Sequence, residues 1–334
     1  MSQTCVTLGL DHRHIYGMTE QMQAVGVTCV GYWTIGEPVT LPGYVERFPE
    51  LPRLSTLDAA LDTGADLALI SCIPGDRAAL AIQAMRAGMD VMTDKPGCVT
   101  SEELDQIKAC VAQTGRIWSV NFSERFETRC STLASDLVAA GAIGNVVHTA
   151  GFGPHRLNRP TRPDWFFDRA RYGGILTDIA SHQIDQFLHY SGAQTAEIAH
   201  AYVANYANPS DPGLQDFGEI NLRSSQASGY IRVDWYTPDA LPNWGDGRLT
   251  ILGTDGYIEL RKYVDVGGAQ GIDHVILVNG TRSEKIDASA ADLPYFARLA
   301  ADMADRTETA MTQSHCFKVM ELALRAQNLA EART

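Results

Sequence analysis

The chain has 334 residues, which is too many for one ordinary hydrophobic core, so we expect two domains. Hydrophobic residues make up 45% of the chain and charged residues 20%, a composition typical of globular proteins, and the net charge is −13. This acidic balance excludes a broad surface for nucleic acid or acidic membranes, although it leaves room for a local basic pocket. No apolar run approaches the ~20 residues that a membrane-spanning helix needs, so we expect no membrane association.

The cysteine pattern and the start of the chain indicate a cellular compartment. The chain contains seven cysteines, an odd number, and no Cys-x-x-Cys pair. This pattern argues against a disulfide framework or a zinc knuckle, and we expect no bound metal. A strand-like apolar run begins at Val6, without the charged region and long apolar core of a signal peptide. These features together predict a cytoplasmic protein.

Strand-like and helix-like segments alternate in the first third of the chain. The expected strands are 6–10, 27–33, 67–72, 90–93 and 117–120, and the expected helices are 15–25, 76–87 and 101–113. A further short helix is expected to begin at Ser55, as its N-cap, and to end at Leu61. The Pro- and Gly-rich passage 36–52 is expected to be irregular. Strands separated by helices predict right-handed βαβ units. Residues 1–122 are therefore expected to form an α/β domain of the Rossmann type, a doubly wound parallel sheet that binds a dinucleotide.

After about residue 122 the pattern changes. We expect helices at 132–140, from Thr177 onward and at 313–331, and strands near 146–151, 196–205, 217–223, 227–236, 248–253, 257–261 and 274–278. Most of these strands lack intervening helices, so they should pair antiparallel. Residues 123–334 are therefore expected to form an α+β domain with a large, mostly antiparallel open sheet, for substrate binding and oligomerisation. Because one face of such a sheet has no partner within the chain, we expect a homodimer or a homotetramer.

The turn after the first strand is a candidate phosphate-binding loop. A dinucleotide site needs a glycine-rich turn that lets backbone amides approach a pyrophosphate at the start of a helix. In the stretch Gly9–His14 only the first glycine of the Gly-x-Gly-x-x-Gly motif is present, and Asp11 takes the second place. The Asp11 side chain crowds the phosphates and adds a like charge, whereas Arg13 can pair with a phosphate. An ordinary strand–turn–helix is the alternative interpretation.

The end of the second strand does not distinguish the two nicotinamide cofactors. It reads Trp33-Thr34, without the carboxylate that commonly binds the adenosine ribose of NAD. Thr34 would also tolerate the 2′-phosphate of NADP. Either NAD or NADP is therefore expected.

Two further motifs carry chemistry. Lys95 follows an expected buried strand, at the edge where open α/β sheets bind ligands, and a solvated loop lysine is the alternative. Asp178, His182 and Asp185 are spaced to lie on one face of a helix. A carboxylate beside an imidazole favours the charged imidazole and orients it for proton transfer. The alternatives are a surface ion pair and part of a metal site.

Several of these motifs resemble the Gfo/Idh/MocA oxidoreductases, the relatives of glucose–fructose oxidoreductase and inositol dehydrogenase. Asp94-Lys95-Pro96 is similar to the family's Glu-Lys-Pro signature, with Asp in place of Glu, and Ile73-Pro74 is similar to the turn after its fourth strand. The segment Gly173–Asp185 resembles the family's GG-x-L-x-D-x-x-x-H-x-x-D motif. Shorter similarities follow in the family's order at 141–146, 165–168, 253–259 and 322–326, so the resemblance covers nearly the whole chain.

The resemblance implies hydride transfer between nicotinamide and a hydroxyl or carbonyl carbon of a sugar, polyol or related small molecule. It assigns catalysis to Lys95, Asp178 and His182. The expected cofactor-binding residues are Gly9, Asp11, His12, Arg13, His14, Trp33, Thr34, Ile73, Pro74, Asp94 and Lys95. The expected substrate-binding residues are Arg125, His155, Arg156, Trp165, Asp178 and His182.

The loop that contains His155, Arg156 and Trp165 also carries Arg159, Arg162 and Arg171. Its arginines suggest an acidic group on the substrate, a cofactor contact or a subunit contact. Two other functions stay open, because some relatives use bound NAD to cleave glycosides and others are non-catalytic, nucleotide-responsive regulators. The missing glycines favour the regulator, and the three catalytic residues count against it.

Overall fold

The computed structural model describes residues 3–333, and its contacts divide the chain into two compact units. The first unit contains the chain up to residue 121 together with 163–173 and 294–320. The second contains 122–162, 174–293 and the chain from 321 onward. Two segments that lie after the expected domain boundary, 163–173 and 294–320, thus make their contacts with the first unit.

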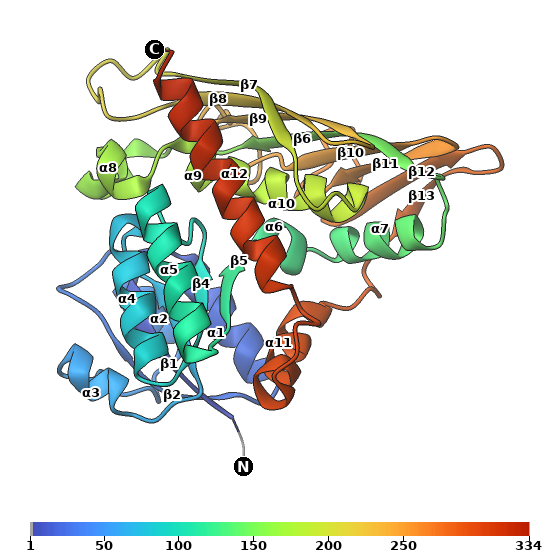
Figure 1. Cartoon of the computed structure of the whole chain (residues 1–334). Helices are drawn as coiled ribbons and strands as arrows, with labels where there is room; N and C mark the ends of the chain where they lie inside the picture. The colour runs from blue at the N-terminus through green and yellow to red at the C-terminus, as the bar shows by residue number, and fades with distance from the viewer. Residues whose placement is uncertain (1–2, 334) are drawn as a thin grey trace. The chain divides into compact units, whose positions relative to one another are not determined.

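A five-stranded parallel sheet forms the centre of the first unit (Figure 1). Its strands are β1 (Thr4–Leu10), β2 (Thr28–Trp33), β3 (Leu67–Ser71), β4 (Asp90–Asp94) and β5 (Trp118–Asn121), in the order β2-β1-β3-β4-β5. Every residue of β3, β4 and β5 is buried, as expected for strands covered on both faces. The strand order reverses between β1 and β3. Ligands of open α/β sheets bind at such a switch point, beyond the carboxyl ends of the strands.

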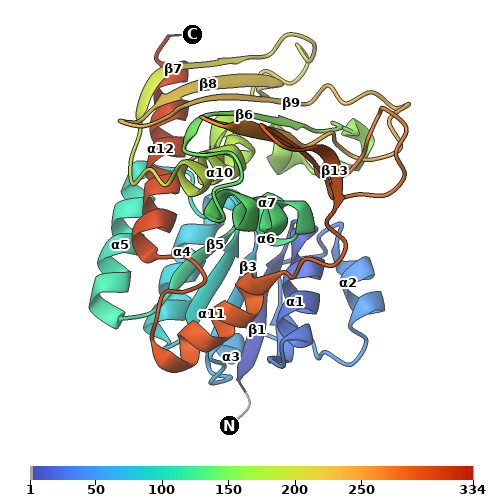
Figure 2. The same ribbon diagram turned by 90° about the vertical axis from the view of Figure 1, so that its right-hand side faces the viewer.

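Helices α1 (His14–Ala24), α4 (Pro74–Arg86) and α5 (Ser101–Thr114) connect these strands. Because the crossovers are right-handed, β1–α1–β2 and β3–α4–β4 place their helices on opposite faces of the sheet (Figure 2). Helix α5 starts with a capping box, in which the Thr100 hydroxyl accepts from the Glu103 amide and the Glu103 carboxylate accepts from the Thr100 amide. The predicted doubly wound sheet is confirmed, and its elements begin and end within two residues of the predicted positions.

Two local predictions in the first unit are wrong. The passage 36–52 is not wholly irregular, because it contains helix α2 (Leu41–Arg47). Its proline lies in the first turn of the helix. An N–H group there would have no intrahelical acceptor, so the proline costs the helix no hydrogen bond. The short helix α3 (Leu57–Leu61) is capped by Thr56 and not by Ser55, since the Thr56 hydroxyl accepts a hydrogen bond from the amide three residues later at 3.0 Å.

Helix α11 (Pro294–Asp305), which was not predicted, belongs to the first unit. The hydroxyl of its Tyr295 lies 2.6 Å from the Ser119 hydroxyl in β5. Arg306, directly after the helix, donates to both carboxylate oxygens of the buried Asp90 at 2.6 and 3.1 Å. These contacts attach a late segment of the chain to the edge of the parallel sheet.

An eight-stranded sheet forms the second unit, in the order β13-β12-β11-β10-β6-β9-β8-β7. Its strands are β6 (Val146–Pro154), β7 (Glu197–Ala204), β8 (Phe217–Arg223), β9 (Ser228–Asp234), β10 (Arg248–Gly253), β11 (Gly256–Arg261), β12 (His274–Asn279) and β13 (Ser283–Asp287). All neighbouring strands pair antiparallel except β6 and β9, which are parallel. The predicted large, mostly antiparallel sheet is confirmed, while β13 was not predicted.

Helices α7 (Arg129–Ala139) and α10 (Ala180–Ser191) lie along one face of this sheet (Figure 1). Helix α10 packs on β6 and β9, and α7 on β11 and β12. Gly151 in β6 permits the close approach of α10, since a Cβ at this position would lie 2.8 Å from Cγ of Gln183. The remaining elements are α6 (Ser123–Phe126), η1 (Arg159–Thr161), η2 (Asp164–Phe167), α8 (Arg169–Tyr172), α9 (Ile175–Asp178) and the last helix, α12 (Gln313–Glu331).

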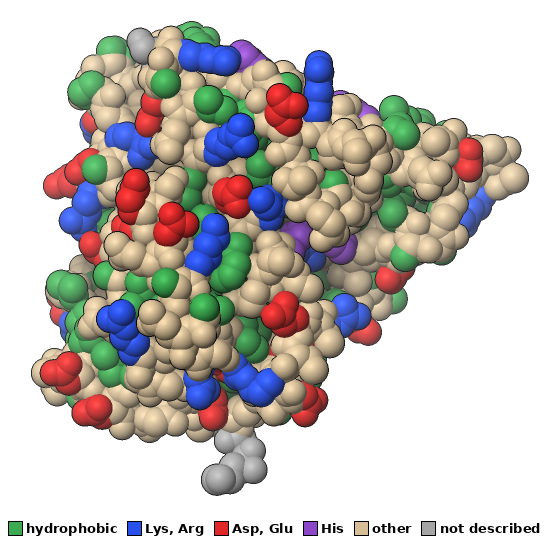
Figure 3. Space-filling model, in the orientation of Figure 1, with side chains coloured by type: hydrophobic (Ala, Val, Ile, Leu, Met, Phe, Trp, Pro, Cys, Tyr) green, Lys and Arg blue, Asp and Glu red, His purple; other side chains and the backbone are tan. Residues whose placement is uncertain are grey.

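The surface agrees with the acidic but mixed composition. On the face drawn in Figure 3, acidic and basic side chains are interspersed. Among residues 3–333, no helix combines the length and the apolar character that crossing a bilayer requires.

Candidate functional site

A cavity of about 330 Å³ lies in the first unit, beyond the carboxyl ends of β1 and β3. Four expected cofactor residues line it, namely Gly9, Asp11, Trp33 and Ile73. Arg171 lines it too, which gives one of the loop arginines a place beside the candidate cofactor site. The lining residues that sequence reasoning missed are Ile35, Leu57, Cys72, Asp76, Ala79, Leu80 and Gln83. Apolar walls with a few charged groups at the switch point of a parallel sheet fit the adenosine part of a dinucleotide.

Gly9 is the one glycine that the loop retains from the dinucleotide-binding motif, and its geometry explains why. Its φ of +78° lies in the left-handed region that favours glycine. A Cβ at this position would also collide with Cβ of Cys72 at the end of the neighbouring strand. Any residue with a side chain would therefore be strained here.

The backbone amides of the loop are partly engaged inside the protein. The amides of Asp11 and His12 both donate to the carbonyl of Ser71, at 2.9 and 3.2 Å. A glycine-rich loop would turn such amides toward a phosphate. The amides of Arg13 and His14, at the first turn of α1, are the ones that helix geometry leaves without an intrahelical acceptor.

Asp11 places a carboxylate on the cavity at the position of the motif's second glycine. Burial raises the pKa of Asp11 to about 6, while Arg77 lowers it and Asp76 raises it further. An ionised Asp11 repels the phosphates of a bound dinucleotide. Arg171 supplies the opposite charge on the same cavity, with Nη2 at 3.3 Å from Oδ2 of Asp76.

Three other expected cofactor residues have different surroundings. Thr34 is buried, and its hydroxyl accepts a hydrogen bond from the amide of Leu10 at 3.3 Å. Arg13 is exposed before the start of α1, and Pro74 is the buried first residue of α4. Within the described part of the chain, Thr34, Arg13 and Pro74 do not line the cavity. Their roles in cofactor binding stay predictions.

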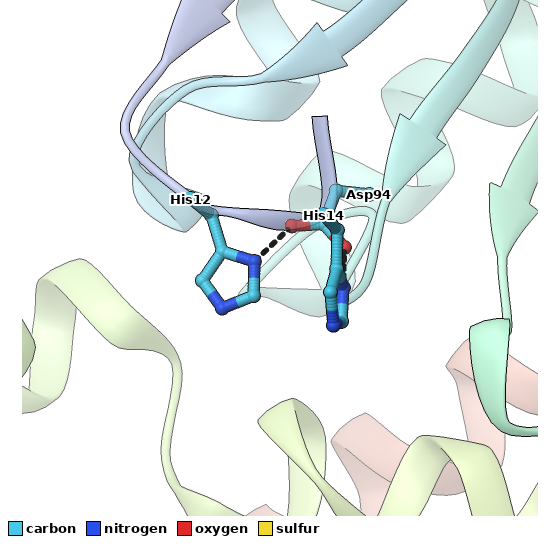
Figure 4. Close-up of side chains that lie close together, drawn as sticks. All are labelled: His12, His14 and Asp94. Carbon is cyan, nitrogen blue, oxygen red and sulfur yellow. Dashed lines mark hydrogen bonds and ion pairs between the residues drawn. The ribbon is translucent and has the colours of Figure 1, made fainter. Parts of the chain in front are cut away.

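Asp94 ends β4 as a fully buried carboxylate that four side chains contact. Nη2 of Arg77 donates to Oδ2 at 2.9 Å, and the Ser71 hydroxyl donates to the same oxygen at 3.3 Å. Nδ1 of His12 lies 2.9 Å from Oδ2, and Nδ1 of His14 lies 2.7 Å from Oδ1 (Figure 4). Burial alone would raise the pKa of Asp94, but Arg77 and the two imidazoles hold it well below its ordinary value. Asp94 therefore stays ionised and ties the end of β4 to the loop after β1.

Arg77 is the buried cation that balances Asp94. It is fully buried on α4, and it also donates to the carbonyl of Cys72 at 2.9 Å and to the carbonyls of Lys95 and Pro96. A planar guanidinium with five N–H donors can satisfy all of these acceptors at once. The Lys95–Pro96 peptide bond is cis, and the Lys95 side chain is 5% exposed. Arg77 thus holds the backbone of the expected catalytic lysine at the carboxyl end of β4.

His12 interacts electrostatically with His14 and Lys95 as well as with Asp94. Burial lowers the pKa of His12 below its ordinary value, and although Asp94 raises it, His14 and Lys95 lower it again. The four expected cofactor residues His12, His14, Asp94 and Lys95 therefore belong to one electrostatically coupled group.

Glu124 in α6 is a buried carboxylate of the second unit. It accepts hydrogen bonds from Nζ of Lys262 at 2.6 Å and from Nε2 of Gln183 at 2.9 Å, and Lys262 also donates to Oε1 of Gln186 at 2.9 Å. Glu124 and Lys262 are only 2% and 0% exposed. Burial alone would raise the pKa of Glu124, but Lys262 and His182 lower it to about 2. Because Gln183 and Gln186 belong to α10, the network fixes this helix, and with it His182, against α6.

The helix that carries Asp178 and His182 is interrupted, which corrects the prediction of one continuous helical face. Helix α9 ends at Asp178, and α10 begins at Ala180 after a break at Ile179. Asp178 and His182 therefore stand on two consecutive helices, and Ile179 between them keeps the right-handed helical conformation (φ −95°, ψ −47°). Both side chains are nonetheless buried, at 8% and 2% exposure.

A contact with the last helix explains the start of α9 and the glycine before it. The amide of Leu176 donates to Oε1 of Gln327 at 2.9 Å. A Cβ at Gly174, where φ is +83°, would collide with the same glutamine side chain. The start of α9 is thus set by α12, which sequence spacing cannot show.

Asp185, the third member of the expected face, is paired with Arg125. Nε and Nη2 of Arg125 each donate to one carboxylate oxygen of Asp185 at 2.6 Å. Asp185 is fully buried, and the guanidinium also lies over the ring of Phe126, with its carbon 4.4 Å from the ring centroid. Much of Arg125 is therefore engaged within the second unit, and its contact with substrate stays a prediction.

The other expected substrate residues are divided between the units. His155 and Arg156 follow β6 in the second unit, where the His155 ring lies 4.6 Å from the ring of the half-exposed Trp244. Trp165 and Arg171 belong to the first unit. The residues of the expected single loop are thus divided between the two units.

Three buried charged residues that organise these sites were missed from the sequence, namely Arg77, Glu124 and Lys262. The partners are 17 residues apart for Arg77 and Asp94, and 138 residues apart for Glu124 and Lys262. No local spacing marks such pairs. The only signal is a charged residue within an apolar segment, and a residue on an exposed helix face gives the same signal.

Comparison with known proteins identifies the family of this chain. Residues 43–122 match the profile of an oxidoreductase family with an NAD-binding Rossmann fold, and residues 132–259 match the GFO/IDH/MocA C-terminal domain. The crystal structure of a protein classed as an oxidoreductase, from Erwinia carotovora atroseptica SCRI1043, is 42% identical and has a TM-score of 0.95 over 98% of each chain. The chain belongs to the Gfo/Idh/MocA oxidoreductases.

Other Gfo/Idh/MocA proteins are more distant. The scyllo-inositol 2-dehydrogenase (NAD(+)) of Bacillus subtilis (strain 168) is 24% identical over 88% of this chain and 84% of its own length. The aldose-aldose oxidoreductase of Caulobacter crescentus shares the fold, with a TM-score of 0.79 at 18% identity over 100% of this chain and 99% of that chain. The resemblance seen in the sequence is confirmed. The protein is an NAD(P)-dependent oxidoreductase, with NAD or NADP as its cofactor.

Replacing Asp11 by Asn should strengthen cofactor binding. The substitution keeps the size of the side chain and removes the charge that opposes the phosphates. The dissociation constant for NADH should therefore fall by up to about tenfold, from a micromolar to submillimolar value in the wild type. Fluorescence titration with NADH and NADPH measures the change.

The control for this substitution is Asp62→Asn, an equal charge change at the exposed end of α3 and outside the cavity. Equal affinities of the wild type and Asp11→Asn would contradict the electrostatic penalty. A complete lack of saturable binding of all four nicotinamide cofactor forms would contradict the assignment of the cofactor cavity.

Breaking the Glu124–Lys262 pair from one side should destabilise the protein more than removing both charges. Glu124→Gln or Lys262→Met alone leaves a buried group without its partner and should lower the free energy of unfolding by about 3–5 kcal/mol. The double variant should recover much of this loss, as urea unfolding followed by tryptophan fluorescence will show. Arg53→Ala removes an exposed ion pair with Glu37 and should leave the unfolding midpoint unchanged. Single variants as stable as the wild type would rule out a structural role for the pair.

Proposed function

We propose that the enzyme transfers a hydride reversibly between its nicotinamide cofactor and a hydroxyl-bearing carbon of a sugar, polyol or related small molecule. The observation that carries the proposal is the cavity at the switch point of the parallel sheet, with Lys95 buried at the end of the neighbouring strand β4. The name of the relative from Bacillus subtilis, scyllo-inositol 2-dehydrogenase, supports a polyhydroxylated substrate.

In this mechanism, His182 accepts the proton of the substrate hydroxyl during oxidation and returns it during reduction. Asp178 orients His182 and supports its positive charge. Lys95 donates a hydrogen bond to the reacting oxygen and stabilises the alkoxide character that develops there. The bound nicotinamide supplies the hydride acceptor. All three side chains are at most 8% exposed, a degree of burial that strengthens such electrostatic interactions.

The residues of the first unit support binding of the dinucleotide. Gly9 permits close approach of the backbone, and Trp33 forms part of the apolar wall of the cavity. Arg171 carries the charge that attracts phosphate and offsets the repulsion by Asp11. Arg13 remains a second candidate for a phosphate contact, because it is exposed beside the start of α1.

Substrate contacts are proposed for Arg125, His155, Arg156 and Trp165. The aromatic surface of Trp244 beside His155 is 43% exposed and suits the apolar face of a sugar ring. Arg156 donates to the carbonyls that follow β9, with its strongest contact at 2.6 Å, so its side chain has a defined direction.

A nucleotide-responsive regulator is the second candidate function. Two features favour it, because both weaken phosphate binding. Asp11 places a carboxylate in the lining of the cavity, and two loop amides already donate to the Ser71 carbonyl. Turnover of NAD and NADP with a panel of polyols separates the candidates. Net reduction of the cofactor supports the dehydrogenase, glycoside cleavage without net reduction supports the NAD-dependent hydrolytic alternative, and binding without turnover supports the regulator.

Location and assembly follow from other features. All seven cysteines are buried free thiols, which supports a reducing, cytoplasmic location. The sheet face opposite α7 and α10 exposes large apolar side chains, among them Leu252 at 41% and its cross-strand neighbour Tyr257 at 38%. We therefore infer that this face is covered by a second copy of the chain.

His182→Ala should lower turnover by roughly 10²–10⁴-fold, the usual effect of losing a positioned acid or base. Lys95→Ala should have a comparable effect, because losing one donor to a developing oxyanion costs on the order of 3 kcal/mol. The affinity of His182→Ala for NADH should stay close to that of the wild type. Steady-state assays with an identified polyol measure these changes, with His200→Ala in β7 as the control. A His182→Ala enzyme with wild-type turnover would overturn the mechanism.

Charge on the open sheet face should disrupt assembly. Leu252→Asp places a carboxylate on the face proposed for the subunit contact and should convert dimers or tetramers into monomers, as light scattering will show. Val45→Asp is the control, because Val45 is similarly exposed, at 43%, on α2 of the first unit. A wild-type protein that is monomeric at micromolar concentration would refute the predicted assembly.

A further inference from the structure

Three side chains of the first unit bring potential metal ligands together. His12, His14 and Asp94 place one ligand-type atom each within 4.8 Å of one another (Figure 4). The imidazoles come from the loop after β1 and from the first residue of α1, and the carboxylate ends β4. No metal was expected from the sequence, because its cysteines form no metal-binding pattern. A site that joins two histidines to a carboxylate 80 residues later leaves no such pattern.

Asp94 determines which nitrogen of each imidazole carries the proton. An ionised carboxylate can only accept hydrogen bonds, so Nδ1 of His14, which is hydrogen-bonded to Oδ1 at 2.7 Å, must present an N–H group. Nδ1 of His12 lies 2.9 Å from Oδ2, where the charge of the carboxylate favours a proton on the same nitrogen. A neutral imidazole with its proton on Nδ1 keeps a lone pair on Nε2. Asp94 therefore converts His12 and His14 into a pair of Nε2 ligands.

The two Nε2 atoms lie on the same side of the cluster. Figure 4 shows both on the ring edges that point away from Asp94. The rings of His12 and His14 meet edge to face, with centroids 4.4 Å apart, and the side chains are 26% and 28% exposed. Two imidazoles that bind one ion at metal–nitrogen distances of about 2.0–2.1 Å have ring centroids roughly 4.5 Å apart at a right angle and roughly 5.2 Å apart in a tetrahedral site. The observed separation of the rings is thus within about 1 Å of that of a chelating pair.

We propose that this cluster binds one divalent transition-metal ion through Nε2 of His12 and Nε2 of His14, with Asp94 as the outer carboxylate that orients both rings. Imidazole ligands select zinc or cobalt(II) over magnesium and calcium, which prefer oxygen. Metal-binding histidines commonly donate their other N–H to a carboxylate in this way. The remaining coordination positions take water or an oxygen of a bound ligand. The site goes beyond the proposed function and does not depend on it.

The charges around the cluster set its expected affinity for a metal ion. The positive charge of Arg77 is offset by its direct contact with Asp94. Asp11 precedes His12 and adds a negative charge, whereas Lys95 follows Asp94 and adds a positive one. Two nitrogen ligands surrounded by charges of both signs fit a micromolar dissociation constant for the ion.

Titration of the metal-free, full-length protein with cobalt(II) tests the site, because the visible absorption of cobalt reports its ligands and geometry. We expect saturation at one ion per chain with a micromolar dissociation constant, and displacement by zinc. The double variant H12N/H14N should lose saturable binding. Each Asn amide can still donate to Asp94 in place of Nδ1, but it has no counterpart of Nε2.

The control H148N/H200N also removes two histidines, from β6 and β7 of the second unit, and should bind cobalt like the wild type. Long-range ¹H–¹⁵N spectra of the histidine-labelled wild type give a readout that needs no variant. We expect Nδ1–H tautomers for His12 and His14, with Nε2 resonances that shift when zinc is added.

The proposal is overturned if cobalt does not bind saturably, if H12N/H14N binds it like the wild type, or if Nε2 carries the proton on either ring. None of these measurements uses the cofactor or turnover. A negative result therefore leaves the proposed dehydrogenase function unaffected, and a failure of that function leaves the metal site unaffected.

Discussion

Arg77 and Asp94 form an ion pair without solvent access at the carboxyl edge of the parallel sheet. Removing two charges from water is costly, and the interaction persists only where the remaining donors and acceptors are also satisfied. Here the carboxylate accepts from Ser71 and contacts two imidazoles, while the guanidinium reaches three backbone carbonyls. The ends of β3 and β4, the loop after β1 and the backbone of Lys95 are therefore held by one network. Loss of either partner would release all of them together.

A second buried pair has the same role in the other unit. Glu124 and Lys262 meet beneath α10, and the glutamines at 183 and 186 connect the pair to the helix that carries His182. In both units a proposed catalytic side chain, Lys95 or His182, is adjacent to a buried charge pair and not part of it. Each pair therefore fixes the backbone beside a proposed catalytic residue.

The loop after β1 differs from the common dinucleotide-binding loop in a consistent way. Gly9 is retained because of its left-handed backbone and the adjacent Cys72, whereas the later positions carry Asp11, His12 and His14. Two loop amides are bound by the Ser71 carbonyl, and both imidazoles are bound by Asp94. Part of the loop's capacity to bind phosphate is therefore taken up by contacts inside the protein, and its two histidines lie beside Asp94.

Much of the fold could be predicted from the sequence, because hydrophobic periodicity and turn residues are local properties. The parallel sheet, the open antiparallel sheet and the family motifs around Lys95 and His182 were all identified in this way. The contact that sets the start of α9 was not, because it joins the Leu176 amide to Gln327, 151 residues further along the chain. The roles of Arg77 and Glu124 were also not visible, since their partners lie far along the chain and only tertiary packing excludes water from them. The sequence by itself therefore determined the architecture and the residue types at the carboxyl edge of the parallel sheet. Tertiary structure decided which charges are paired, because only packing brings distant residues together and excludes water from them.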